Sequence, residues 1–300
     1  MYSAKQNRNR HYLTNTLKIS ALSLLLFSAA CSSESGTASN TDKESKPSGE
    51  TTQTAAAVYD SALKEAQALE SYAIESKTNY SVEQPAAEGA EAPKPTETVI
   101  DITGDVIAKP EVQYGLKIDT VAQGQQGTTE LYAAGDELHT KSGSDAWSTK
   151  SLKNTDEEMS ITTDLLDPAP LLEELESYKD SLKLTEDDKS YTLSLEASGE
   201  EAGKLIQASL GRQLGESAEA DQLSQLLQNG SEGSVSYNLT IDKTSNQLMS
   251  SAVKLDTNLT VSEQALHITA NSDGTYSKQN EVGEIAVPAE ATADTKTSKK

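Results

Sequence analysis

The chain has 300 residues, of which 47 are acidic and 25 are basic, so its formal net charge is −22. A surface this acidic disfavours binding to nucleic acid and to anionic lipid headgroups. The single cysteine excludes an internal disulfide and a cysteine-rich metal site. Because the acidic residues are spread along the chain, they favour a solvated surface over a dedicated cation store.

The N-terminal 30 residues have the parts of an export signal. Residues 1–18 are basic, and residues 19–30 form an apolar run that ends in small residues before Cys31. A helical run of this length spans about 18 Å, which is less than the roughly 30 Å of a bilayer core. We therefore predict a cleaved signal peptide over residues 1–30 rather than a membrane-spanning anchor.

The residues before the cysteine, Ser28-Ala29-Ala30-Cys31, resemble the lipobox of bacterial lipoproteins. The match is imperfect, because Ser28 stands where that motif prefers leucine. The resemblance implies a diacylglyceryl thioether and an acylated amine on Cys31, which give stable anchoring. It also implies a membrane partner and a location on the outer face of the cytoplasmic membrane. The alternative is an ordinary cleaved signal followed by a chance cysteine.

The rest of the chain divides by composition. Residues 31–54 are almost free of apolar side chains and predict a lipidated cysteine on a disordered tether. Residues 55–290 form the predicted folded body, and residues 291–300 a disordered tail. A second low-complexity segment, residues 85–96, predicts a disordered loop between two strands.

The body begins with helical periodicity over residues 55–72, with Thr54 as its cap. The period then changes to two, which predicts strands. These cover residues 72–82, 98–107, 112–121, 128–134 and 137–141, with a short piece around Trp147. Gly135-Asp136 suits the turn of a hairpin.

The second half of the body is first helical and then rich in strands. Asp167-Pro168 opens a predicted helix that runs through Tyr178. The other predicted helices cover residues 199–214 and 218–227. The predicted strands cover residues 182–184, 191–195, 235–241, 253–261 and 266–270, with a closing strand over 276–285. We assign turns to residues 243–246 and to Asp273-Gly274.

This order of elements resembles the LolA/LppX-like superfamily of bacterial lipoproteins and lipid carriers, and within it an uncharacterised Gram-positive lipoprotein family. The likeness is carried by residues 57–75, 130–152 and 237–291. It implies an α+β fold, in which a curved antiparallel half-barrel sheet is covered on its concave face by helices. In lipid-carrying relatives, acyl chains lie between the sheet and the helices.

Residues for catalysis are sparse in this sequence. His139 and His267, the two histidines after Cys31, occupy alternating strand positions, where we expect surface or rim side chains. The nucleophile motif Gly-x-Ser-x-Gly is absent. The acidic clusters 156–158 and 186–188 lack the alternating spacing of a calcium loop and favour solvated turns. We therefore expect no enzyme activity, no metal and no cofactor.

The leading hypothesis is a tethered binding protein for a hydrophobic or lipid ligand. Its ligand would be lined by apolar residues of the strands and of the helical cover: Val235, Tyr237, Leu239, Ile241, Val253, Leu255, Leu259, Leu266, Ile268, Leu205, Ile206, Leu210, Leu223 and Leu226. A plain hydrophobic core would use the same residues. The alternative is therefore a structural or interaction lipoprotein of the cell envelope with a filled core and no ligand. A sensor of envelope stress is a third hypothesis.

Overall fold

The computed structural model describes residues 53–86, 92–152, 166–214, 233–261 and 264–293. The predictions for the signal peptide, Cys31, the helix over 218–227 and the acidic cluster 156–158 lie outside these residues, as does most of the tether. Within the described ranges, no helix combines the length and the apolar character needed to cross a bilayer.

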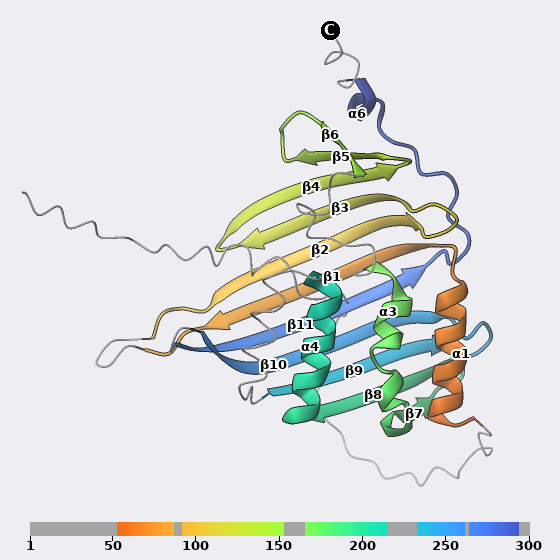
Figure 1. Cartoon of the computed structure of the whole chain (residues 1–300), viewed down its shortest axis with the longest axis vertical. Helices are drawn as coiled ribbons and strands as arrows, with labels where there is room; N and C mark the ends of the chain where they lie inside the picture. Colours follow the sequence, from red (N-terminus) through yellow and green to blue (C-terminus); the bar gives the residue numbers. More distant parts are fainter. Residues whose placement is uncertain (1–52, 87–91, 153–165, 215–232, 262–263, 294–300) are drawn as a thin grey trace, which may run out of the picture.

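One antiparallel sheet of eleven strands forms the framework of the protein (Figure 1). Its strand order is β6-β5-β4-β3-β2-β1-β11-β10-β9-β8-β7, so β6 and β7 are its two edges and the sheet stays open. The first and last strands therefore pair in its middle. The strands are β1 (Ser71–Glu83), β2 (Thr96–Ile107), β3 (Gln113–Ala122), β4 (Gln125–Ala134), β5 (Glu137–Ser142), β6 (Ser148–Ser151), β7 (Lys183–Glu186), β8 (Ser190–Ser198), β9 (Gly233–Asp242), β10 (Leu248–Val261) and β11 (Gln264–Ser277).

Three helices lie over one half of the sheet. In Figure 1, α1 (Ala55–Ala68), α3 (Pro168–Glu173) and α4 (Glu200–Leu214) lie in front of strands β7–β11. The 3₁₀ helix η3 (Glu176–Ser181) follows α3, and both contact α1. Helix α4 packs on β8 and β9, and α1 reaches β8. The α1 residues Val58, Ala62 and Ala66 are buried at helical spacing, which gives α1 one apolar face.

The helix caps follow the sequence predictions. The hydroxyl of Thr54 accepts a hydrogen bond from the backbone N–H of Ala57 at 3.2 Å. The carboxylate of Asp167 caps α3 through the N–H of Ala169 at 2.8 Å, with Pro168 at the first helical position. The first helix ends at Ala68, before the predicted residue 72, because Leu69 is extended and Ser71 already belongs to β1.

The predicted turn at Asp273-Gly274 is wrong, since both residues lie inside β11. Gly274 pairs with Ser76 on β1 and with Ser251 on β10, so β11 continues to Ser277 with neighbours on both sides. Asp-Gly in a sequence is typical of a turn. Here, however, Ser272, Gly274 and Tyr276 are buried at every second position, so the strand continues through the glycine.

The predicted closing strand over residues 276–285 is also wrong. Lys278 and Asn280 have positive φ angles, and the chain turns there across the outward face of the sheet. The backbone N–H of Asn280 donates to the carbonyl of Ser71 at 2.7 Å. We name residues 278–288 the C-terminal strap. A β-carbon at Gly115 on β3 would lie 3.3 Å from Ile285 of this strap, so glycine permits the close packing.

The tail prediction needs a correction as well. The strap is followed by the short helix α6 (Ala289–Ala293), and Ala291 is completely buried. Part of the segment 291–300 is therefore folded onto the body rather than free.

Candidate functional site

The strand register defines one inward face, which turns toward the helices. Tyr237 on β9 belongs to this face, and its hydroxyl donates to Oε1 of Glu174, just after α3, at 2.7 Å. Cross-strand partners share a face, so the register extends this inward face from β9 to β1 and on to β4.

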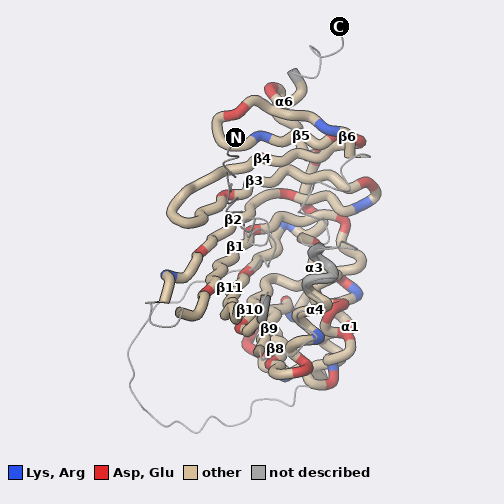
Figure 2. The backbone as a smooth tube through the Cα atoms, turned by 60° about the vertical axis from the view of Figure 1, so that its left-hand side comes forward, with Lys and Arg blue, Asp and Glu red and all other residues tan. Residues whose placement is uncertain are grey.

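The inward face carries no charge at the positions whose side chains are described on β1–β5 and β8–β11. The charged residues of these strands alternate onto the outward face, as Lys77 and Asp101 do in their 3.0 Å ion pair. Figure 2 shows Asp and Glu positions distributed over many elements rather than gathered in one patch. Charge is thus kept off the inward face of these nine strands, and only the edge strands carry charged residues there among the described positions, with Lys150 on β6 and Glu186 on β7.

Most of the predicted ligand-lining residues lie together on this face. Eight strand residues are between 0% and 7% exposed: Val235, Tyr237, Leu239, Ile241, Val253, Leu255, Leu259 and Ile268. Leu266 is half-buried and packs against the same core. From α4, Leu205 and Ile206 join this core. Leu210 lies in α4 without a described side chain, and Leu223 and Leu226 lie outside the described residues.

The middle of the inward face carries small side chains instead of large ones. We name this set the small-residue strip; it comprises Ser76 and Thr78 on β1, Ala270, Ser272 and Gly274 on β11, and Ser251 on β10. All six are buried. The hydroxyls of Thr78 and Ser272 lie 3.3 Å apart and hydrogen-bond to each other.

Two hydroxyls of the small-residue strip lack a hydrogen-bond partner among the residues that the structure describes. They belong to Ser76 and Ser251, and the hydroxyl of Thr257, further along β10, is in the same state. Leaving a buried hydroxyl unpaired costs about 1–3 kcal/mol. The strip leaves no signal in the sequence, because Ser76 and Thr78 alternate with the equally polar Glu75 and Lys77, and because Asp273-Gly274 is typical of a turn.

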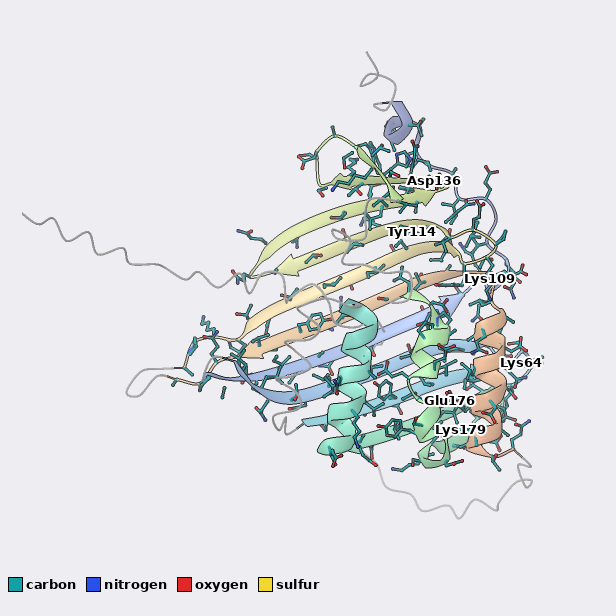
Figure 3. All side chains as sticks on the ribbon, viewed as in Figure 1. Lys64, Lys109, Tyr114, Asp136, Glu176 and Lys179 are labelled. Atoms are coloured by element: carbon teal, nitrogen blue, oxygen red, sulfur yellow. The ribbon has the colours of Figure 1, made fainter. Side chains whose placement is uncertain are left out.

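Two further tyrosines contribute to the core. Tyr114 on β3 is buried, and burial raises the pKa of its hydroxyl to about 12 (Figure 3). The hydroxyl of Tyr59 on α1 donates to the carbonyl of Leu172 at 2.7 Å and ties α1 to α3. Burial, followed by the nearby carboxylates of Glu176, Asp60 and Glu173, raises the pKa of Tyr59, so it stays protonated at neutral pH.

The two histidines differ in their surroundings. His139 on β5 is 2% exposed, so the prediction of a surface position is wrong for this residue. Its Nδ1 lies 2.9 Å from the hydroxyl of Thr149 on β6. His267 on β11 is partly exposed, as expected, and its Nε2 donates to Asp256 at 2.9 Å. This hydrogen bond raises the pKa of His267; burial opposes it, and the charge of Asp256 and the interactions with Glu83 add to the increase.

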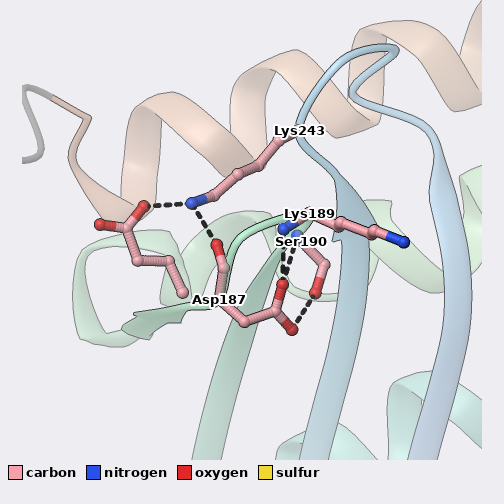
Figure 4. A network of polar contacts seen from close by, with 5 residues as sticks. Asp187, Lys189, Ser190 and Lys243 are labelled. Atoms are coloured by element: carbon pink, nitrogen blue, oxygen red, sulfur yellow. Dashed lines mark hydrogen bonds and ion pairs between the residues drawn. The ribbon is translucent and has the colours of Figure 1, made fainter.

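The cluster at residues 186–188 forms a hydrogen-bonded turn. The carboxylate of Asp187 accepts from the backbone N–H groups of Lys189 and Ser190 at 2.7 and 2.8 Å, and from the Ser190 hydroxyl at 2.8 Å (Figure 4). Lys243 donates to Glu186 at 2.6 Å and to the carbonyl of Asp187. The hydrogen bonds from Lys189 and Ser190 lower the pKa of Asp187, and the charge of Lys243 adds to this. In the described part of the chain, no group of three His, Cys, Asp or Glu residues could hold a metal ion.

An open pocket of about 320 Å³ lies on the outward side, between the sheet and the C-terminal strap. It is bounded by Gly115, Tyr132 and Asp105 of the sheet and by Lys278 and Ile285 of the strap. Lys278 donates to Asp105 at 3.1 Å, and Tyr132 packs edge-on against Trp147 at 5.8 Å. Trp147 is half-buried and lies directly before β6.

These features define an open antiparallel-sheet protein with helices packed on part of one uncharged face. Residues 54–296 match the family of unknown function DUF6612, and the chain belongs to that family. The match begins at Thr54, the cap of α1, and extends past α6, so it covers the described fold.

Other comparisons add little to this assignment. No curated protein matches the chain. A crystal structure of a beta-barrel-like protein of the domain of unknown function DUF1849 from Brucella abortus is similar over 69% of this chain and 99% of that one. The sequence identity is 7% and the TM-score is 0.19, which is too low to carry an argument.

Proposed function

We propose that this protein is an exported lipoprotein that binds a hydrophobic or lipid ligand between its sheet and its helices. The observation that carries the proposal is the uncharged inward face. A chain with 47 acidic and 25 basic residues keeps every described inward position of β1–β5 and β8–β11 free of charge. An extended uncharged surface suits an acyl chain, which needs no directional partner.

The same proposal includes the fold type and the anchor. We infer a LolA/LppX-like half-barrel, whose concave side is the inward face under α1, α3 and α4. The lipobox-like segment before Cys31 supports acylation of that cysteine and a place on the outer face of the cytoplasmic membrane. The family match starts at residue 54, which supports a lipidated cysteine and tether over residues 31–54.

Two measurements test the proposal separately. For the anchor, a chain with Cys31→Ser should lose its membrane association, whereas the natural chain should sediment with membranes and incorporate labelled palmitate. For the ligand, native mass spectrometry of the purified chain should show a lipid-sized adduct that solvent extraction recovers. A chain that carries no adduct and binds no added lipid would contradict the binding function and leave the anchor intact.

The alternative is a structural or interaction lipoprotein with a filled core. The low exposure of Leu193, Leu239 and Ile241, which is 0% for each, supports this second candidate. In a filled core, Leu239→Ala should lower the free energy of unfolding by about 2–5 kcal/mol. Added lipid should then leave the melting temperature unchanged, whereas a ligand-binding interior would be stabilised by it.

A further inference from the structure

We propose that the small-residue strip binds the uncharged polar group of the ligand, and that the ligand is a neutral ester lipid of the diacylglycerol type. This inference rests on the proposed binding function and specifies its ligand class. It separates the natural ligand from a pure hydrocarbon and from an anionic phospholipid.

The side chains at the middle of the inward face are small. One continuous row of register partners crosses five strands, and its members in order are Ile102, Ser76, Gly274, Ser251 and Leu239. Large side chains occupy both ends of this row, while its three central positions carry two CH₂OH groups and a hydrogen atom. Ser76 and Ser251 are two strands apart, which places their backbones about 10 Å from each other.

The hydroxyls of Ser76 and Ser251 are buried and unpaired among the described residues. Ser76 is 6% exposed and Ser251 is 1% exposed, and neither hydroxyl has a hydrogen-bond partner within the described ranges. Each hydroxyl can donate one hydrogen bond and accept two. Ester carbonyls accept such bonds, and a glycerol hydroxyl both donates and accepts them. A lipid with these groups would satisfy both serines, which a hydrocarbon cannot do.

The inward positions described on β1–β5 and β8–β11 offer no positively charged side chain for a phosphate group. Phosphate groups are bound in proteins by Arg, Lys or clusters of backbone N–H groups. The described inward positions of β1–β5 and β8–β11 carry no Lys or Arg, and the carboxylate of Glu174 is bonded to Tyr237 of the same face. Tyr237 is the register partner of Val253, the next inward residue after Ser251. The carboxylate of Glu174 would therefore repel an anionic headgroup at this face, whereas it would not repel a neutral ester.

The test uses the full chain with Cys31→Ser, loaded with the neutral fluorescent probe Nile red. Dioctanoylglycerol, dioctanoylphosphatidylglycerol and hexadecane are compared as competitors. We expect dioctanoylglycerol to displace the probe at a concentration at least tenfold lower than the other two. Adding Ser76→Ala and Ser251→Ala should raise the concentration of dioctanoylglycerol needed by at least tenfold and leave that of hexadecane unchanged.

The matched control is Ser81→Ala with Ser250→Ala, which removes one serine from β1 and one from β10 on the outward face. In the displacement assay, this control variant should give the same competitor concentrations as the protein that carries only Cys31→Ser. Equal displacement by all three competitors, tighter binding of phosphatidylglycerol, or no effect of the Ser76 and Ser251 changes would overturn this inference alone. If the Ser76 and Ser251 substitutions had no effect, their hydroxyls would bind only buried water and not the ligand. Failure of every competitor to displace the probe would overturn the binding function as well.

Discussion

The hydroxyl of Tyr237 donates to Oε1 of Glu174 at 2.7 Å and joins the inward face of β9 to the end of α3. Tyr237 is 1% exposed and Glu174 is half-buried, so the bond is shielded from water. Hydrogen bonds to charged acceptors contribute about 1.5–3 kcal/mol to stability. This bond is therefore a direct tie between the helices and the sheet.

The first prediction concerns this tie. Tyr237→Phe keeps the ring and removes the donor, so the free energy of unfolding should fall by about 1–3 kcal/mol. Urea unfolding with an unchanged m-value measures the change. The double variant with Glu174→Leu should lose less than the sum of the two single changes, because Tyr237→Phe removes the donor and Glu174→Leu removes the acceptor of the same bond. Strict additivity would show that the tie contributes nothing.

The second prediction concerns the turn between β7 and β8. Hydrogen bonds from Lys189 and Ser190 lower the pKa of Asp187 in the folded state. Its stabilising effect is therefore fully present above the unfolded pKa of about 3.9, and it is lost as the pH falls through the folded value. Asp187→Asn should lower the melting temperature at neutral pH, and the difference from the natural chain should shrink in acid. Asp188→Asn, exposed on the same turn, is the control and should match the natural chain at every pH.

The third prediction has the opposite sign. The hydrogen bond with Asp256 raises the pKa of His267 in the folded state, so its contribution is fully present below the unfolded pKa of about 6.5. It is lost as the pH rises through the folded value. At pH 5, His267→Asn should therefore be less stable than the natural chain, by at most about 1 kcal/mol because the pair is partly exposed. At pH 9 the two proteins should be equally stable. A difference that grows with pH would contradict the assignment.

The fourth prediction concerns the C-terminal strap. A β-carbon at Gly115 would lie 2.9 Å from the ring of Tyr132 and 3.3 Å from Ile285. Gly115→Val should therefore displace the strap and reduce stability by about 1–3 kcal/mol. Limited proteolysis should then cut within residues 278–288 first. Gly127→Val on β4 is the control, because a β-carbon there would meet nothing within 4 Å. Equal protease resistance in both variants would contradict the close packing of the strap.

The sequence was sufficient to predict most of the strands, for a physical reason. Strands with one buried and one solvated face alternate in polarity, and Val235, Tyr237, Leu239 and Ile241 do so without interruption. The caps at Thr54 and Asp167 were also predictable, because each side chain bonds within three residues of itself. Local interactions of this kind leave local signals.

The errors arose where distant contacts decide the structure. His139 looks like a surface residue, but the strand β6 and its Thr149 bury it. Gly274 looks like a turn, but β1 and β10 hold it in a strand from both sides. The small-residue strip is formed by residues of β1, β10 and β11. Because β1 and β11 are about 200 residues apart in the sequence, no local sequence pattern predicts the strip.

The pairing of β1 with β11 has a consequence for how the molecule is made. Ala73 pairs with Ser277, so the central seam cannot close until the chain has been synthesised as far as residue 277. Until then β1 presents an unpaired edge, the kind of edge that promotes sticking between nascent chains. Loss of the last strand by early termination would split the sheet through its centre rather than trim it at a margin.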